Sequence, residues 1–452
     1  MRLLSRLLAC LAAATLLVAQ PAAAQSILRD AETEQLLQDM VDPLVVAAGM
    51  PRGSVEVVLI GDPSMNAFVQ QGQRIYVHSG LINAADSANE VEGVLAHELG
   101  HITGGHVIRF YEGYGKAVKI SMLSLLASLA AMAAGAGEAS AGIMALGSQA
   151  ALGSLLTFTR AQESSADAAG ATYLAGAGIS GKGSLAFFGK LQNREFRYGY
   201  SQDEEQTYSR THPLSGDRIA YLRDRYEKDP AWNKPTDPDI EARFQRVKAK
   251  LYGYLAKPAD TLRSYPAYVN TVPAHYARAY AYHKDARMAE AIRETDALLA
   301  SDPDNPYFLE LKGQVLLESG KPDLALEPLR EATRLTNNNP LIAGTFGHAL
   351  VATENGKHLD EAETVLRAAV AKDRENPFAW YQLGMVYGAK GDLPRARLAS
   401  AEQQIMVGAT AEALRNSDAA LKALPEYSPD WIRAQDVNMQ ARAQLERERD
   451  RK

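Results

Sequence analysis

The sequence His97-Glu98-Leu99-Gly100-His101 is the strongest candidate for chemistry in this chain. It ends an apolar run with helical spacing, which predicts that the motif lies on a helix. A helix advances about 3.6 residues per turn, so His97 and His101 would project from one face and could bind one zinc ion, with Glu98 beside it as a general base. With only 9 His in 452 residues, the pattern would arise by chance about 0.01 times per chain. The motif therefore predicts a zinc peptidase, against the alternative of a purely structural helix.

A tetrahedral zinc site needs a third protein ligand besides the two His, with water in the fourth position. Our candidate is Glu163, which lies in a stretch of helical composition after a long apolar segment. Asp167 follows at i+4, so the same helix would present a second carboxylate able to accept a hydrogen bond from a ligand imidazole. Alone, such a pair is more often a solvated helix face. Together with the His motif it predicts a site for one zinc ion per chain.

The reaction predicted from these residues is hydrolysis of a peptide bond. Zinc lowers the pKa of its water from about 15.7 towards 7, and Glu98 would take the proton as hydroxide attacks, then return it to the leaving amine. The oxyanion needs zinc and a second donor, for which His212 or a nearby Tyr or Arg is a candidate. His106 comes five residues after His101 on the same predicted helix, so we expect it to point away from the ligands and to be structural.

The N-terminal residues have the pattern of a secretory signal peptide. A basic start precedes the apolar run Leu7–Val18, and small residues end at Ala24, which predicts cleavage of residues 1–24 and export. A lipid anchor at Cys10 is disfavoured because the apolar stretch between Arg6 and Cys10 is too short. Since Cys10 is the only cysteine, the mature chain would have no thiol, and zinc must be held by His and carboxylates.

Composition excludes some functions. The chain is 46% hydrophobic and 23% charged, as is ordinary for a globular protein. Its formal net charge is -6, and removal of Arg2 and Arg6 with the signal peptide would take this to about -8, which argues against a nucleic-acid partner. The Lys and Arg at 243–250 are separated by apolar residues, as expected for the solvated side of a helix.

Several elements are predicted to position the motif. Residues 30–50 have the apolar spacing of an amphipathic helix, and residues 55–60 and 74–77 are β-branched runs typical of strands. Residues 66–69 form another extended piece between them. A small sheet thus precedes the metal-binding helix.

Residues 120–159 contain Glu138 as their only charged residue and are rich in Ala, Gly, Ser, Leu and Met. The segment could form two helices that turn near residues 135–138. Three arrangements are open: helices buried in the protein, an apolar hairpin on a membrane surface, and a transmembrane hairpin. We favour the first two because Ala, Gly and Ser provide little driving force for insertion.

The C-terminal half carries an internal repeat. Three columns recur with spacings of 34 and 37 residues: Pro306, Pro340 and Pro377; Gly313, Gly347 and Gly384; Ala291, Ala325 and Ala362. The period is that of tetratricopeptide repeats, which are stacked helix pairs. Pro273 would open the first repeat, the three additional residues fall in a loop near 353–359, and after Leu398 the register is lost.

Clustered prolines after residue 229 mark a boundary between the two halves. We therefore divide the mature chain into a peptidase domain at 25–228, a linker with connecting helices at 229–272 and a repeat domain at 273–450. The predicted fold class is α+β and mostly helical: a zincin-like domain with a small sheet, followed by an all-α tetratricopeptide-repeat solenoid.

The His-Glu-x-x-His and Glu-x-x-x-Asp motifs, together with Asn66-Ala67-Phe68 and Ser79-Gly80-Leu81-Ile82, resemble the zinc metallopeptidase family that includes HtpX and the CAAX prenyl protease. The order of signal peptide, peptidase and C-terminal repeats is similar to that of a periplasmic subgroup of this family, and the resemblance covers nearly the whole chain. It implies that His97, His101 and Glu163 bind zinc and that Glu98 is catalytic.

The resemblance also implies roles for two further segments. Asn66, Ala67 and Phe68 would lie on an edge strand to which a substrate adds as another strand; the alternative is a turn followed by a core Phe. His212 would occupy the open position of zinc and hold the enzyme latent until a substrate or partner displaces it. From the sequence alone, His212 before Pro213 could equally be a loop or capping residue.

Members of this subgroup take part in quality control of outer-membrane proteins and of the lipopolysaccharide-insertion machinery. The resemblance therefore implies a periplasmic endopeptidase that cleaves stalled outer-membrane protein precursors, with repeats that recruit substrate or the assembly machinery. Two rival hypotheses remain: a repeat-based periplasmic chaperone or scaffold whose peptidase is latent or vestigial, and an integral membrane protease.

Overall fold

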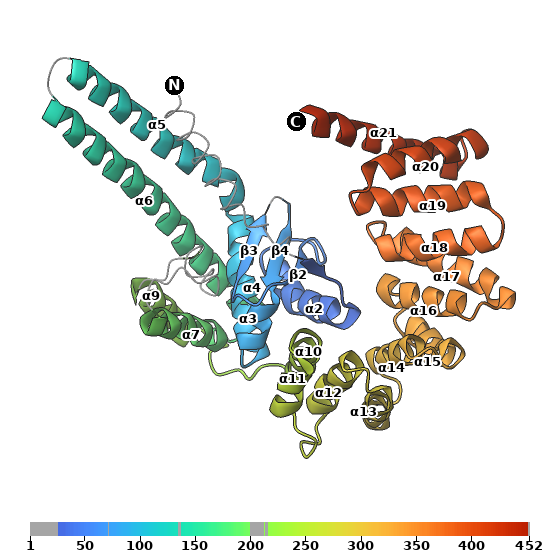
Figure 1. Ribbon diagram of the computed structural model, residues 1–452. Helices are drawn as coiled ribbons and strands as arrows, with labels where there is room; N and C mark the ends of the chain where they lie inside the picture. The colour runs from blue at the N-terminus through green and yellow to red at the C-terminus, as the bar shows by residue number, and fades with distance from the viewer. Residues whose placement is uncertain (1–25, 71, 134–136, 199–211, 213–215, 451–452) are drawn as a thin grey trace, which may run out of the picture.

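The computed structural model describes residues 26–70, 72–133, 137–198, 212 and 216–450. The predicted signal peptide lies outside the described residues. These residues are mostly helical, with one small sheet in the N-terminal half and an arc of paired helices in the C-terminal half (Figure 1). The predicted fold class is confirmed.

The sheet has the strand order β1-β2-β4-β3. Its strands are β1 (Ser26–Leu28), β2 (Glu56–Gly61), β3 (Ala67–Gln70) and β4 (Arg74–His78). The central pair, β2 and β4, is parallel, whereas β1 and β3 pair antiparallel and form the two edges. The strands predicted at 55–60 and 74–77, and the extended piece at 66–69, are confirmed.

One apolar core joins this sheet to the helices around it. The helices are α2 (Ala31–Ala47), α3 (Ser79–Ala84), α4 (Ala88–Thr103), α7 (Lys182–Tyr198), α9 (Gly216–Glu227) and α10 (Pro238–Leu255). Almost all of α4 is buried, including both apolar and charged side chains. α10 lies in the segment that we predict as linker and connecting helices, and its Phe244, Val247 and Leu251 are buried in this core. This part of the connection is therefore firmly attached to the N-terminal half.

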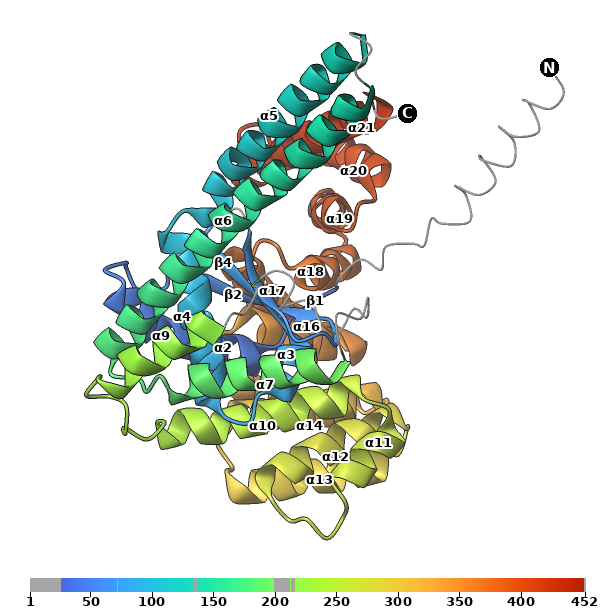
Figure 2. The same cartoon turned by 90° about the vertical axis from the view of Figure 1, so that its left-hand side faces the viewer.

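A long helical hairpin extends from the sheet region (Figures 1 and 2). It consists of α5 (His106–Ala133) and α6 (Gly137–Ala177), which pack along each other. Small residues lie where the helices touch: Ala117 and Ala151 are buried, and the hydroxyls of Ser128 and Ser140 are 2.8 Å apart. Such small side chains let two helices approach closely.

The large apolar side chains of the hairpin face outward instead. The exposed ones are Met122, Leu123, Leu125, Leu126, Leu129, Met144, Leu146, Leu152 and Leu156. Burial of this segment inside the protein, one of the two arrangements that we favoured, is therefore wrong for most of its length. By length and composition, the part of α6 from Ser140 onward is the one helix among the described residues that could cross a membrane.

The repeat half is a series of paired helices, and the predicted solenoid is confirmed. After α11 (Pro258–Ser264), the pairs are α12 (Val272–Lys284) with α13 (Met288–Ser301), α14 (Pro306–Glu318) with α15 (Pro322–Leu335), α16 (Pro340–Ala352) with α17 (Leu359–Lys372), α18 (Pro377–Ala389) with α19 (Leu393–Met406), and α20 (Thr410–Ala423) with α21 (Pro429–Asp450). The three additional residues fall at the short 3-10 helix η2 (Gly356–His358). The last pair continues the arc although its sequence has lost the register.

The repeat columns have clear packing roles. Each Pro of the first column begins a helix, where a missing backbone N–H costs nothing. The three Ala of the third column are fully buried. A Cβ at Gly313 would lie 2.4 Å from Cγ of Leu329, and one at Gly347 would lie 2.4 Å from Cδ2 of Leu366, so these glycines let paired helices touch.

A buried cluster of charges connects α2 to the first repeat. Nζ of Lys250 lies 2.5 Å from Oδ2 of Asp30 and 3.3 Å from Oε2 of Glu32. The hydroxyl of Tyr276, on α12, donates to the same Oε2 at 2.7 Å. Because each of these groups would be costly to bury without its partners, the cluster fixes the peptidase half against the repeats.

Candidate metal centre

Where the helices α4 and α6 cross, a glycine of each helix lies against the backbone of the other. A Cβ at Gly100 would lie 2.6 Å from the carbonyl oxygen of Ala166, and one at Gly170 would lie 3.0 Å from the carbonyl oxygen of Ala96. A side chain at position 100 would push the helices apart, and one at position 170 would require the facing backbone to shift by a few tenths of an ångström. The two glycines therefore let α6 bring Glu163 up to the motif on α4.

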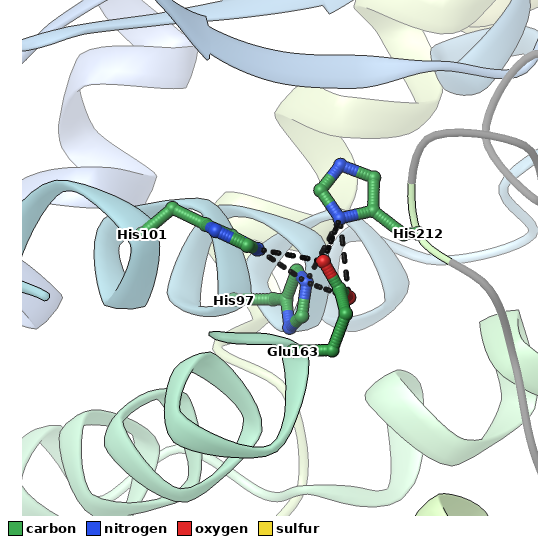
Figure 3. A group of neighbouring side chains, drawn as sticks. All are labelled: His97, His101, Glu163 and His212. Atoms are coloured by element: carbon green, nitrogen blue, oxygen red, sulfur yellow. Dashed lines mark hydrogen bonds and ion pairs between the residues drawn. The ribbon is translucent and has the colours of Figure 1, made fainter. Parts of the chain in front are cut away.

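Four buried side chains meet at this crossing: His97, His101, Glu163 and His212 (Figure 3). Nε2 of His97 lies 3.1 Å from Nε2 of His101 and 3.3 Å from Oε2 of Glu163. Oε1 of Glu163 lies 3.4 Å from Nε2 of His101 and 3.0 Å from Nδ1 of His212. One donor atom from each residue falls in a group no more than 4.8 Å across. The structure thus brings together residues separated by more than a hundred positions in the sequence.

These separations fit a small tetrahedral metal ion. With metal–nitrogen bonds of about 2.05 Å, the corners of a tetrahedron are about 3.3 Å apart. The closest donor pairs in the group, including Nε2 of His97 and Nδ1 of His212 at 3.3 Å, have separations near this value. Imidazole nitrogens and a carboxylate are also ligand types expected for such an ion, and the one cysteine of the chain, Cys10, lies in the predicted signal peptide. The donor set is therefore compatible with a metal ion.

A second layer of contacts holds the donors in place. Nδ1 of His97 lies 3.0 Å from Oδ1 of Asp167, the residue that we expect to orient a ligand imidazole. Nε and an Nη of Arg218 donate to the two oxygens of Asp167 at 2.6 and 2.9 Å, and its other Nη lies 3.0 Å from Oε2 of Glu163. Arg218 thus bridges the two carboxylates of α6.

Sequence reasoning missed Arg218. It lies on α9, where Arg218, Leu222 and Tyr226 are the buried residues. They are spaced by four, so they share the face that packs on the core. A charged residue on the apolar face of an amphipathic helix indicates a buried partner of opposite charge, and this signal could have identified it.

His106 also differs from its prediction. It is buried, and its Nδ1 lies 2.9 Å from Nδ1 of His101. The prediction that it points away from the ligands assumed one continuous helix. In the structure α4 ends at Thr103, and Gly105 has a φ of +63°, so His106 begins a new helix and its ring turns back to His101.

The charges of the donor set are strongly coupled. Burial opposes ionisation of Glu163, but hydrogen bonds with His212 and His97 outweigh it and hold the pKa of Glu163 well below its ordinary value. Burial likewise opposes protonation of His97, yet contacts with Asp167 and Glu163 raise its pKa to about 10. Burial and the charge of His97 lower the pKa of His101. These contacts favour the protonated form of His97 without a metal, whereas a metal ligand is the neutral imidazole, so metal binding and protonation compete at this residue.

Glu98 lies beside the donor set and is completely buried. Neither carboxylate oxygen accepts a hydrogen bond from a described residue, and Oε1 lies 3.5 Å from Nε2 of His212. Burial raises the pKa of Glu98, while the charges of His212 and His97 partly offset this effect. A raised carboxyl pKa and an available oxygen next to a metal site are the properties expected of a general base.

Of the residues predicted for an edge strand, Ala67 and Phe68 lie on β3, which contacts α4, whereas Asn66 precedes the strand and is buried. Among the described residues β3 pairs with β4 alone, with Ala67 opposite Val77. Phe68 is half-buried and stacks on Tyr76 with ring centroids 5.1 Å apart. Its position is thus the outer strand of the sheet and not the turn and core Phe of the alternative reading.

The fold and this site define a metallopeptidase with the zincin motif joined to a tetratricopeptide-repeat solenoid. Residues 31–226 match peptidase family M48. The Protease HtpX homolog of Bacillus velezensis is 30% identical over 230 residues, which are 48% of this chain and 70% of that protein. The chain belongs to peptidase family M48 and is a metalloprotease.

More of the chain is matched by a group of longer relatives. The Beta-barrel assembly-enhancing protease of Escherichia coli (strain K12) is 25% identical over 397 residues, covering 86% of this chain and 78% of that protein. The protein of the same name from Yersinia pestis is 24% identical and covers 88% of this chain and 81% of its own length. The predicted resemblance is confirmed, and it includes the repeats. Among solved structures, the TPR protein YrrB is 22% identical, with a TM-score of 0.32, over 40% of this chain and 94% of its own.

Proposed function

We propose that this chain is an exported, zinc-dependent endopeptidase of the periplasm that cleaves misassembled or stalled envelope proteins. The buried group of His97, His101 and Glu163, with Glu98 beside it, is the observation that carries this proposal. The names of the longest-matching relatives support a role in quality control of outer-membrane proteins. We retain the domain division at 25–228, 229–272 and 273–450.

His97, His101 and Glu163 would hold the zinc ion. When bound, zinc supplies Lewis acidity, which polarises the peptide carbonyl and makes the attacking water more acidic. Glu98 takes the proton of that water and delivers it to the leaving nitrogen. Asp167 keeps the ring of His97 in one orientation through Nδ1, and Arg218 keeps Asp167 ionised.

Substrate binding would use the edge strand β3. Its outer backbone groups face away from β4, so an extended peptide could pair with Ala67 and Phe68 as a further strand. This arrangement favours unfolded or stalled chains over folded proteins, because only they offer an extended segment. The repeats would recruit such precursors or the outer-membrane assembly machinery through the surface of their arc.

His212 is the basis of a proposed latent state. Its Nδ1 lies among the donor atoms, 3.0 Å from Glu163 and 3.3 Å from His97, where it would be a fourth ligand. A fourth protein ligand leaves no position for water, which a catalytic zinc requires.

We therefore expect His212→Ala to raise the rate of casein cleavage by at least about tenfold. Without this imidazole, the fourth position is open to water in every molecule and not only in the fraction from which His212 has moved away. Cleavage is measured on the purified mature chain with one equivalent of zinc. His348→Ala, which removes a His of the repeats, is the control and should cleave at the original rate. An unchanged or lower rate in His212→Ala would contradict latency.

The hairpin supports a peripheral membrane location. Its small residues face each other and its large ones face outward, which is the distribution found in helices surrounded by lipid.

We expect Leu123→Glu combined with Leu126→Glu to weaken sedimentation with vesicles of phosphatidylethanolamine and phosphatidylglycerol at least about tenfold, because each Leu contributes about 1.5–3 kcal/mol on burial. The matched control, Leu324→Glu with Leu393→Glu, changes two exposed Leu of the repeats. Equal binding by both double variants would exclude this surface, and resistance of the protein to alkaline carbonate would indicate an integral membrane protease.

The second candidate function is a periplasmic chaperone or scaffold with a latent or vestigial peptidase. The presence of His212 in the donor set favours it, because the site as arranged is closed. Casein cleavage by the original chain, Glu98→Gln and His212→Ala separates the two functions. If all three give the same rate, the endopeptidase proposal fails and the scaffold remains.

A further inference from the structure

The two ligand imidazoles of α4 have outer partners of different kinds. In each ring Nε2 faces the donor set, where the two Nε2 atoms are 3.1 Å apart. Nδ1 of His97 meets the carboxylate of Asp167, whereas Nδ1 of His101 meets Nδ1 of His106 at 2.9 Å. Between two ring nitrogens at this distance, one must carry the proton and the other must accept it.

Which nitrogen of His101 carries the proton would follow from metal binding at Nε2. If Nε2 of His101 binds zinc, its remaining proton is on Nδ1, which then donates to His106. His106 can accept only if its Nδ1 is bare, so its own proton must be on Nε2. The contact therefore requires one tautomer for each ring.

Backbone contacts on both sides of His106 hold its ring against His101. A Cβ at Gly104 would lie 2.4 Å from Nε2 of His106, so the ring occupies space that any other residue at position 104 would fill. The backbone carbonyl of His106 accepts a hydrogen bond from Nε2 of Gln162, the neighbour of Glu163 on α6, at 3.2 Å. His106 is thus tied both to the ligand on α4 and to the helix that carries the carboxylate ligand.

We propose that His106 is a positioning residue of the metal centre, which accepts a hydrogen bond from Nδ1 of His101 and so fixes the tautomer and orientation of that ligand. This inference rests on the proposed zinc function. It assigns to a neutral imidazole the role that the carboxylate of Asp167 has for His97.

Zinc affinity tests the proposal in the full-length mature protein. His106→Leu keeps much of the volume but removes the acceptor, and we expect zinc to bind about 10- to 100-fold more weakly in competition with a chelating dye. His106→Asn places an amide oxygen near the position of Nδ1, so it should restore affinity to within about threefold of the original. The control His348→Leu should bind as the original does. Original affinity in His106→Leu, or equal weakness in the Asn and Leu variants, would overturn the proposal.

A second measurement uses only the unmodified protein and so does not depend on whether a variant folds. Long-range ¹H–¹⁵N spectra of zinc-loaded protein with ¹⁵N-labelled His should show His106 protonated on Nε2 and His101 protonated on Nδ1. His106 protonated on Nδ1 would overturn the proposal even if the Leu variant did not fold. Failure of the unmodified protein to bind zinc would instead overturn the proposed function, so the two failures are distinguishable.

Discussion

Glu98→Gln is expected to remove most of the peptidase activity while leaving the metal centre assembled. Gln has nearly the size of Glu but cannot take a proton from the attacking water. General acid–base catalysis contributes about 10²- to 10⁴-fold, so casein cleavage should fall by a factor in this range. The comparison is best made with His212→Ala present in both proteins, because a latent site would hide the loss.

The matched control is Glu92→Gln, which changes another buried Glu on α4. The side chain of Glu92 accepts a hydrogen bond from Asn89 and is not part of the donor group. Zinc content should be unchanged in both variants, and cleavage should be unchanged in Glu92→Gln. Full activity of Glu98→Gln would show that the base is another group and would remove the proposed mechanism.

Arg218→Met is expected to cause the largest loss of stability. Arg218 is buried, binds both oxygens of Asp167 and lies 3.0 Å from Glu163, so its removal takes the guanidinium away from two buried carboxylates, which keep their contacts with His97. Breaking a buried ion pair in this way costs about 3–5 kcal/mol. Urea unfolding of the chelator-treated protein at pH 7 should show a decrease of this size. Arg223→Met, an exposed position on the same helix, should change the free energy of unfolding by less than about 0.5 kcal/mol.

The effect of Arg218→Met should depend on pH with a definite sign. Burial alone would raise the pKa of Asp167, but hydrogen bonds with Arg218 and His97 outweigh it and lower the pKa below the ordinary value of 3.8. The stability that Asp167 contributes is therefore complete above its unfolded pKa and is lost as the pH falls through the lower folded pKa. The difference between the variant and the original chain should shrink in acid; a difference that grows there would contradict the assigned pair.

Local spacing explains which parts of the site can be predicted from the sequence. His97 and His101 lie one helical turn apart, so their common face follows from helix geometry alone. The repeat columns are similarly local, because Pro306 and its equivalents mark the same point of each unit. Glu163 can be proposed because it lies four residues before Asp167, so these two carboxylates also share one face of a helix.

The remaining contacts depend on how separate segments pack. The meeting of Arg218 with Asp167 requires the position of α9 on α6, which no pattern within α9 specifies. His106 could not be placed because its contact depends on the end of α4 at Thr103 and on the turn that follows. For the hairpin, Ala and Gly allow either packing inside a protein or exposure to lipid, so composition left the choice open.

The crossing of α4 and α6 also has a consequence for which cation the protein can use. Gly100 and Gly170 put the helices in backbone contact, and Nδ1 of His97 on α4 lies 3.0 Å from Oδ1 of Asp167 on α6. Calcium prefers about 6–8 oxygen ligands at about 2.3–2.6 Å, and magnesium requires near-octahedral oxygen coordination. A small centre of three imidazole nitrogens and one carboxylate suits neither ion. The donor types of this centre therefore favour a transition metal over calcium or magnesium.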